Sequence, residues 1–210
     1  MSLPLISCIM PTANRERYVP LAIKYFLQQN YTNRELIIID DGILPVKALI
    51  PNDRRIKYFY VDKFSSIGTK RNYACDQAKG DIIMHWDDDD WHSFDWISAQ
   101  VHFLTCSDAD ICGIQHVRYY YTIKGKLYTI YRKYTDGLNP MNWVHGATMA
   151  YYKSFWKAHP FKNLQYGEDD DFLMNSGAKL CIHNYIDGFV CILHPNNTII
   201  REFEDRKHKR

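Results

Sequence analysis

The sequence lacks three features that would assign it to a particular class of protein. Nowhere do about eighteen apolar residues run together, so no membrane-spanning helix is predicted. The apolar stretch at the start is short and interrupted by Pro11 and Arg15, which does not fit a signal peptide. The six cysteines form no Cys-x-x-Cys pair, so buried, reduced thiols are expected instead of a disulfide scaffold. We therefore expect a soluble, cytoplasmic chain.

A large net charge is also missing. The 26 Lys and Arg residues against 24 Asp and Glu residues give a net charge of +2, which provides no electrostatic reason to expect a nucleic acid partner. The small basic excess includes residues 206–210, which we expect to be solvated. A hydrophobic content of 46% in 210 residues is enough for one well-packed domain over 1–210.

The first half of the chain alternates between apolar strand patterns and amphipathic helix patterns, which is typical of βαβ units and a mainly parallel sheet. Strands are predicted at 5–10, 36–39, 56–61, 82–86 and 111–115, and helices at 17–29, 68–78 and 96–104. The second half predicts an antiparallel hairpin at 119–123 and 127–131, a loop at 139–146, a strand at 147–152 and a helix at 170–176. We predict a single α/β domain with a nucleotide-type half at about 1–115, a more irregular half at about 116–197 and a charged tail at 198–210.

Two of the predicted strands end directly in carboxylates, at Asp40-Asp41 and at 87–90. In an open parallel sheet, ligands bind beyond the carboxyl ends of the strands, so both groups should face one crevice. Four consecutive aspartates repel one another unless a cation or a ring of donors neutralises them. Oxygen ligands suit Mg²⁺ or Mn²⁺, which would in turn hold a diphosphate. The alternative for 87–90 is an exposed acidic turn.

The Asp40-Asp41-Gly42 segment alone is weak evidence, because Asp-Gly after a strand is often only a turn. Together with the second group, a carboxylate here could accept a hydrogen bond from a base N–H or a ribose hydroxyl. Lys70 and Arg71 lie in the first turns of a predicted helix, where a solvated face is as good an interpretation as a functional one. A guanidinium there would suit bidentate contact with a diphosphate or a base.

A third acidic group, at 168–171, precedes the last predicted helix. Acidic residues in a first helical turn often cap free N–H groups and complement the helix dipole, but capping does not require four carboxylates. One of them beside the crevice could act as a general base on a substrate hydroxyl. His194 ends an apolar run; it is either a core or turn histidine or an additional metal ligand.

The order of these motifs resembles the inverting family 2 glycosyltransferases of GT-A fold over about residues 4–197. The resemblance rests on IMPTANR after the first strand, LIIIDDG after the second, GTKRNYACDQAKGDIIMHWDDDDW, a Gly-Glu-Asp segment before a helix, and the late His194. Its most specific part combines Arg71-Asn72-x-Ala74, Ala78-x-Gly80 and the Asp-x-Asp-Asp motif. The size and the tyrosine-rich second half also resemble the capsid-glycosylating glycosyltransferases of large algal viruses.

The resemblance implies a nucleotide-diphosphate sugar donor, most often a UDP-sugar, bound in the half at about 1–115. By position, Pro11, Thr12 and Asn14 would lie along the nucleotide. Asp41 would accept from the uracil N–H, and Arg71 would flank the base or the diphosphate. Where the family usually has Tyr before the Asn of the first loop, this chain has Ala13. Either Tyr18 or another aromatic residue replaces that ring, or the site is less selective for the base.

The same resemblance assigns the metal site and the catalytic base. Asp87 and Asp88 would approach the ribose and the metal, Asp89 would be the principal carboxylate ligand of Mn²⁺ or Mg²⁺, and Asp90 could substitute for it. His194 matches a position that often completes the metal or phosphate site. Asp169 matches the catalytic base of the family.

The sequence thus predicts a metal-dependent inverting glycosyltransferase of the hexosyltransferase type, with a glycan or glycoprotein acceptor. Asp169 would remove the proton of an acceptor hydroxyl during a single displacement at the anomeric carbon. The acceptor would lie in the half at about 116–197, where Trp143, His145 and Tyr166 could stack on sugar faces, although most such rings are packing residues.

Two other functions stay open. A nucleotidyltransferase would normally have a Gly-rich phosphate loop after the first strand, and this loop has no glycine. A non-catalytic sugar-nucleotide or glycan-binding module would have no need of a base and a complete metal motif.

Overall fold

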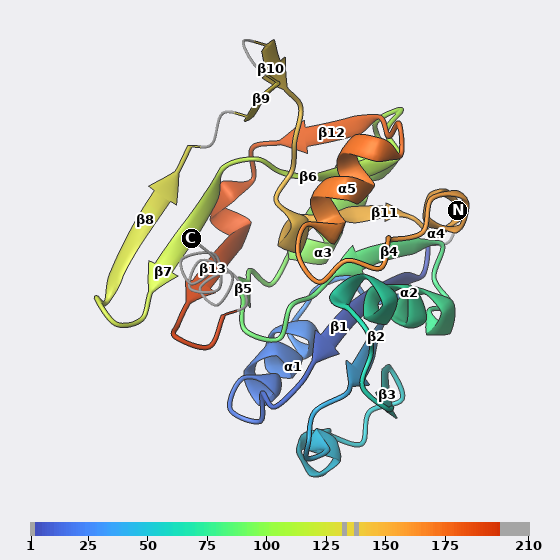
Figure 1. Cartoon of the computed structure of the whole chain (residues 1–210), viewed down its shortest axis with the longest axis vertical. Coiled ribbons are helices and arrows are strands. Elements are labelled where there is room, and N and C mark those ends of the chain that lie inside the picture. Colours follow the sequence, from blue (N-terminus) through green and yellow to red (C-terminus); the bar gives the residue numbers. More distant parts are fainter. Residues whose placement is uncertain (1–2, 132–133, 137–138, 198–210) are drawn as a thin grey trace.

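Seven strands form the central sheet, in the order β12-β6-β11-β4-β1-β2-β3 (Figure 1). The structure is a computed structural model that describes residues 3–131, 134–136 and 139–197; the predicted tail at 198–210 lies outside them. The strands are Ile6–Thr12 (β1), Arg34–Asp40 (β2), Ile56–Tyr60 (β3), Ile82–His85 (β4), Ile111–Ile114 (β6), Ala150–Tyr152 (β11) and Leu180–His183 (β12). Neighbouring strands pair in parallel except at β11, which is antiparallel to both β4 and β6. The predicted, mainly parallel α/β sheet is confirmed.

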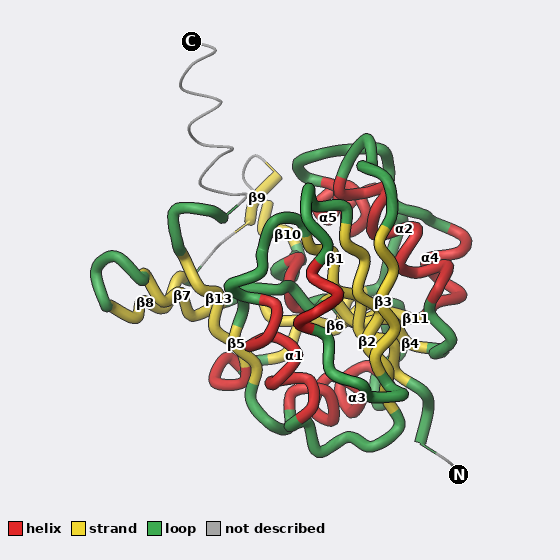
Figure 2. Tube along the Cα trace, turned by 90° about the horizontal axis from the view of Figure 1, so that it is seen from below, coloured by secondary structure: helices red, strands yellow, loops and turns green. Residues whose placement is uncertain are grey.

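Helices cover both faces of this sheet (Figure 2). They are Val19–Leu27 (α1), Ile67–Gln77 (α2), Trp96–Thr105 (α3), Lys153–Ala158 (α4) and Glu168–Asn175 (α5), with 3-10 turns at Val46–Leu49, Gly146–Thr148 and Ile186–Gly188. Side chains of a strand alternate between faces, so Cys8 and Met10 of β1 pack with α1 and α3, whereas Ile9 packs with α2 and α5. The result is a three-layer α/β/α arrangement. None of the described helices has the length and apolar character needed to cross a bilayer.

A second, four-stranded sheet stands beside the first and contains the predicted hairpin. Its order is β5-β13-β7-β8, with Trp91–His92 (β5), Phe189–Leu193 (β13), Val117–Tyr121 (β7) and Lys126–Ile130 (β8). The hairpin β7–β8 is antiparallel, as predicted, while β13 and β7 are parallel. A short pair, Tyr134–Asp136 (β9) and Asn139–Met141 (β10), follows the hairpin.

The largest differences from the sequence prediction lie between 139 and 152. The predicted loop begins with strand β10, and the predicted strand at 147–152 is reduced to β11 because Gly146–Thr148 forms a 3-10 turn. The Thr148 hydroxyl stabilises this turn, since it donates to the His145 carbonyl at 2.7 Å and accepts from the Ile114 N–H at 3.2 Å. Local side chain to backbone hydrogen bonds of this kind compete with a regular strand.

Candidate functional site

A cleft of about 690 Å³ opens at the carboxyl ends of β1, β2 and β4. Its walls come from loops and helix ends that are far apart in the sequence: residues of the loop after β1, Asp41 after β2, residues between Lys63 and Arg71, the turn Asp87 to Asp90, residues between Trp143 and Ala147, the segment Gln165 to Asp170, and Cys191 and Asn197. The expectation that the carboxylates after β2 and β4 face one crevice agrees with this arrangement. The third acidic group, at the start of α5, lines the same cleft.

The two aspartates after β2 have different environments. Asp40 is fully buried and accepts hydrogen bonds from the backbone N–H groups of Gly42 and Val46, both at 2.9 Å, and from the Tyr58 hydroxyl at 2.7 Å. It therefore closes the turn and has no free face toward a ligand. Asp41 lines the cleft, where Lys70 donates to its Oδ1 at 2.6 Å.

Lys70 and Arg71 are buried, which excludes a solvated face, one of the two alternatives for this part of α2. The helix begins at a capping box formed by Ser66 and Thr69, so both basic side chains lie in its first turns and enter the cleft. Burial lowers the pKa of Lys70, opposed mainly by its hydrogen bond with Asp41. Its ammonium also donates to the Thr12 carbonyl at 2.5 Å, which links α2 to the end of β1.

The residues of the first loop that were predicted to lie along the nucleotide have two different environments. Pro11 and Thr12 line the cleft, and the Thr12 hydroxyl donates to Asp88 Oδ2 at 2.6 Å. Asn14 is exposed, with a φ of 54°, and its side chain accepts from the Ile43 N–H at 2.8 Å. Asn14 thus fastens the loop that follows β2, and it is not among the residues that line the cleft.

The four aspartates after β4 have separate partners. Arg71 contacts Asp87 at 3.4 Å, Thr12 binds Asp88, and Arg15 donates to Asp89 at 2.8 Å. Asp90 is buried and accepts from the Ile192 N–H of β13 at 3.0 Å, so it ties the turn to the small sheet. Burial and the neighbouring Asp89 raise the pKa of Asp88 to about 7.

His194 lies directly against Asp89, as the metal prediction requires, but it is hydrogen-bonded as a donor. Its Nε2 is 2.9 Å from Asp89 Oδ2, and its Nδ1 accepts from the Asn196 N–H at 3.2 Å. In the neutral ring the proton must then be on Nε2, pointing at Asp89. Tyr18 stacks on this imidazole with ring centroids 4.3 Å apart, and Tyr18 does not line the cleft.

The donor set after β4 suits a divalent cation in kind but not in its present arrangement. Asp87, Asp89 and His194 offer carboxylate oxygens and an imidazole nitrogen, which Mn²⁺ accepts. Among the described residues, however, no group of three such side chains is arranged as a metal site. The Arg15 guanidinium lies 2.8 Å from Asp89 Oδ2 and 3.3 Å from His194 Nε2. A cation bound by these residues would have to replace Arg15.

Arg71 joins the turn after β4 to the start of α5. Its Nε donates to Glu168 Oε1 at 3.0 Å, while its Nη2 faces Asp87. Burial opposes the charge on Arg71, but Asp87, Glu168 and Asp169 outweigh it and raise the pKa of this guanidinium. Its third nitrogen, Nη1, is buried without a hydrogen-bond partner among the described residues. A buried guanidinium N–H in a cleft is a donor for an anion.

The four carboxylates at 168–171, in the first turn of α5, each have a different environment. Glu168 binds Arg71, Asp170 accepts from Trp143 Nε1 at 2.7 Å, and Asp171 accepts from Lys162 at 2.7 Å. Asp169 is the remaining one, and it lines the cleft. Its Oδ1 accepts only the N–H of Asp170, at 2.9 Å, among the hydrogen bonds of the described residues.

Asp169 is held against Gly146, the first residue of the 3-10 turn. A Cβ atom at position 146 would lie 1.7 Å from Asp169 Oδ2, so only glycine leaves room for the carboxylate. Burial, followed by the charges of Glu168 and Asp170, raises the pKa of Asp169 to about 7, while Arg71 opposes the shift. Such a carboxylate exchanges its proton near neutral pH, which suits a general base.

A series of buried, hydrogen-bonded side chains contacts the carbonyl group of Gly146. His85, the last residue of β4, has its Nδ1 2.7 Å from the Gly146 carbonyl oxygen, and its Nε2 3.3 Å from the Tyr151 hydroxyl. Cys75 of α2 lies 3.4 Å from the same hydroxyl. Burial holds the pKa of His85 well below its usual value, so the ring is neutral and its Nδ1–H donates to Gly146. The sequence offered no signal for this role of His85 beyond its position at the end of an apolar strand.

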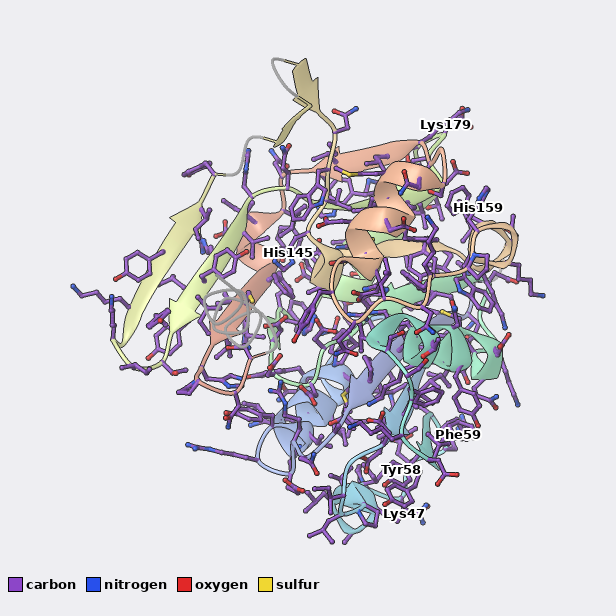
Figure 3. The ribbon with its side chains drawn as sticks, viewed as in Figure 1. Lys47, Tyr58, Phe59, His145, His159 and Lys179 are labelled. Atoms are coloured by element: carbon purple, nitrogen blue, oxygen red, sulfur yellow. The ribbon has the colours of Figure 1, made fainter. Side chains whose placement is uncertain are left out.

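The aromatic residues expected to form an acceptor wall do reach the cleft. Trp143, His145 and Tyr166 line it together with Asp169, and His145 lies between the small sheet and α5 (Figure 3). Trp143 and His145 are buried and pack edge to face, with ring centroids 5.8 Å apart, whereas Tyr166 is exposed. Phe64 also lines the cleft, and its N–H donates to Asp41 Oδ2 at 3.2 Å. Sequence reasoning missed Phe64 because it follows β3 without a motif.

The fold and the cleft define an α/β domain of the GT-A kind. The structure of S. aureus TarS in complex with UDP-GlcNAc superposes with a TM-score of 0.75 at 19% sequence identity, covering 92% of this chain and 60% of that one. The mannosyltransferase PcManGT from Pyrobaculum calidifontis, in complex with GDP-Man and Mn²⁺, superposes with a TM-score of 0.73 at 14% identity, covering 99% of this chain and 61% of that one. At these identities the likeness establishes the fold.

The sequence comparison identifies the family. The profile of glycosyl transferase family 2 matches residues 7–164, and the chain belongs to this family. An uncharacterized glycosyltransferase of Haemophilus influenzae is 38% identical over 109 residues, which cover 50% of this chain and 44% of that protein. The chain thus spans less than half the length of this curated relative. The resemblance to viral capsid-glycosylating enzymes stays a prediction.

Proposed function

We propose that the chain transfers a sugar from a nucleotide-diphosphate donor, a UDP-sugar, to a hydroxyl group of a glycan or glycoprotein, with inversion at the anomeric carbon. The observation that carries the proposal is the position of the Asp169 carboxylate in the cleft. Its carboxylate is packed against Gly146 with a pKa of about 7, in the same cleft as the turn at 87–90. One wall of the cleft therefore offers a base, and Arg15 and Arg71 beside the turn at 87–90 offer positive charge that can neutralise a diphosphate.

The proposed transfer is a single displacement in which Asp169 is the base. As the acceptor oxygen attacks the anomeric carbon, Asp169 takes the hydroxyl proton, and the bond from that carbon to the diphosphate oxygen breaks with its electron pair leaving on the diphosphate. A positioned base of this kind contributes about 10²-fold to 10⁴-fold in rate. Attack from the side opposite the leaving group inverts the configuration.

The leaving diphosphate requires positive charge, and two arginines of this chain are suited to supply it. Arg71 has a free N–H at Nη1, and Arg15 lies at the turn with Asp89. Asp87, Asp89 and His194 would hold Mn²⁺ or Mg²⁺, which when bound supplies charge neutralisation at the diphosphate. Arg15 would then leave Asp89 and become available to the phosphate oxygens.

The nucleotide base is assigned to the side of the cleft formed by Asp41 and Lys70. Uracil presents an N–H beside a carbonyl. The Asp41 carboxylate would accept from this N–H, and the Lys70 ammonium, 2.6 Å from Asp41 Oδ1, would donate to the carbonyl. Phe64 offers a ring in place of the one missing at Ala13, since Tyr18 covers His194 instead. TarS was solved with UDP-GlcNAc and PcManGT with GDP-Man, and guanine presents a similar N–H and carbonyl edge, so GDP-sugars are the alternative donors.

The proposal is tested by release of nucleoside diphosphate from a panel of UDP-sugars and GDP-sugars with Mn²⁺, using wild type, Asp169→Asn and Asp89→Asn. Asp76→Asn, on the exposed face of α2, is the matched control. We expect release by wild type and the control, and loss of at least about 10²-fold in the other two. Donor binding without turnover under any acceptor would identify a binding module instead, and pyrophosphate release from a nucleoside triphosphate would identify a nucleotidyltransferase.

A further inference from the structure

The β7–β8 hairpin exposes an unusual amount of apolar surface. It extends away from the body of the molecule in both views (Figures 1 and 2), and none of its residues lines the cleft. Ile123 in its turn is 69% exposed, Leu127 on β8 54% and Tyr131 directly after β8 71%, and Tyr120 on β7 and Tyr128 on β8 are also exposed. Exposed apolar side chains gathered on one projecting element mark an interaction surface.

Three apolar side chains form a row on one face of the small sheet. The register pairs Tyr120 with Leu127 across the hairpin and Ile192 with Tyr120 across β13 and β7. Residues paired in this way point to the same face, so Ile192, Tyr120 and Leu127 lie side by side across three strands. Ile123 lies next to this row, in the turn that joins β7 to β8. The end of the row at Leu127 is therefore one residue from the start of β8, close in sequence to the turn that holds Ile123.

The charge on this segment is of one sign. Between Asp110 and Asp136 the sequence has no Asp or Glu, and its basic residues are Arg118, Lys124, Lys126, Arg132 and Lys133. Lys124 and Lys126 are exposed and flank Gly125, the last residue of the turn, with the Lys124 ammonium 5.4 Å from the Tyr121 ring. Arg118 is neutralised by Asp187. The tip thus presents lysines beside aliphatic side chains, with tyrosines on the strands behind.

This combination matches the surface of an anionic bilayer. Tyrosine rings favour the headgroup level, lysines are attracted to anionic lipids, and a few aliphatic side chains enter the acyl boundary. We propose that the β7–β8 hairpin docks the protein on an anionic membrane surface, with Ile123 and Leu127 inserted and Lys124 and Lys126 at the headgroups. The proposal does not depend on the donor or on Asp169.

A second copy of the chain fits this surface less well. The outer edge of β8 is the end of the small sheet, and Lys126 lies on it, where charged residues oppose pairing with another strand. Two copies would also bring the lysines of both tips together without an acidic partner on the hairpin. Exposed Ile and Leu side chains are equally out of place on a nucleic acid surface, which contacts basic and stacking groups.

The test is co-sedimentation of the full chain with vesicles of phosphatidylcholine alone and with phosphatidylglycerol added. Ile123→Ser with Leu127→Ser removes the aliphatic tip, and Lys124→Glu with Lys126→Glu reverses the charge. The controls are Ile43→Ser with Leu44→Ser, an exposed apolar pair elsewhere, and Lys24→Glu with Lys157→Glu, which change the net charge equally. All these positions are exposed, so retained melting temperatures will confirm that each variant folds.

We expect the wild type to bind only vesicles that contain phosphatidylglycerol, and each hairpin variant to bind at least about tenfold more weakly. Both controls should bind within about twofold of the wild type. Hairpin variants that bind as the wild type does would overturn the proposal and assign any binding to another basic surface. No binding of the wild type to either vesicle also overturns it, and concentration-dependent dimers abolished by the Ser variant would show that the occupant is a second copy.

Discussion

Replacing Gly146 with alanine tests whether the position of Asp169 decides the rate. The added methyl carbon would lie 1.7 Å from Asp169 Oδ2 and 2.6 Å from its Cγ, so the carboxylate must move by more than an ångström to reach an ordinary contact. A misplacement of about 1 Å costs about 10²-fold in rate, or about 2.7 kcal/mol in the activation free energy. The nucleotide side of the cleft is untouched, so donor affinity should stay within about threefold of wild type.

The assay is the initial rate of nucleoside diphosphate release, measured as kcat and donor KM. Gly177→Ala is the control: its φ of 71° makes alanine strained, by about 1–2 kcal/mol, in a place with no neighbour within 4 Å and outside the cleft. Both variants should lose comparable stability, because overpacking at 146 also costs about 1–3 kcal/mol. A Gly146→Ala enzyme with a kcat within about threefold of wild type would refute the claim that this contact positions the base.

Three further predictions follow from the same geometry. His85→Phe removes the hydrogen bond to the Gly146 carbonyl, so kcat should fall by about tenfold at unchanged donor KM. His85→Asn keeps an N–H donor and should recover part of the lost kcat. An equal loss of kcat in both variants would assign His85 to packing alone. The pKa of Asp169 is raised to about 7, and a base works only when deprotonated, so kcat should rise with pH through about 7; a rate that falls there would contradict the assignment. Chelation with EDTA should weaken donor binding at least about tenfold by calorimetry, and unchanged affinity would refute a metal at Asp89.

The stability of the protein should depend on Asp169 in the opposite sense to its activity. The pKa of this carboxyl is about 7 in the folded chain and near 3.8 when unfolded, so proton binding favours the folded state. The contribution of the protonated form is complete below about 3.8 and is lost as the pH rises to about 7. Asp169→Asn should therefore raise the melting temperature above neutral pH, in line with active-site carboxylates that reduce stability for function.

The sequence predicted the sheet because its strands are strong and local signals. The mainly apolar runs at 5–10, 36–39 and 82–86 contain most of β1, β2 and β4 and stop at Pro11, Asp40 and Asp87, and their order with the intervening helices permits little besides a parallel sheet. Those same endings brought Asp41 and Asp87 to one edge. Asp169 was predicted by resemblance, and the structure places it in the same cleft.

The partners of these carboxylates could not be predicted, because they come from distant parts of the chain. Arg71 binds Glu168, and Arg15 binds Asp89, contacts that depend on how the whole chain closes around the cleft. Asn14 and Asp40 belong to the same motifs as cleft residues, yet their hydrogen bonds hold the loop after β2. A one-dimensional pattern cannot tell which side of a turn a polar side chain faces. The position of Gly146 beneath Asp169 had no local signal either.

The configuration of the product at the anomeric carbon tests the central claim most directly. If Asp169 deprotonates the acceptor for attack opposite the diphosphate, proton NMR of the first product formed from an α-linked donor must show a β-linked sugar, and the α-linked form must not appear before it. A product that retains the configuration of the donor would require two displacements or attack from the diphosphate side. That result would contradict a single step with Asp169 as the base.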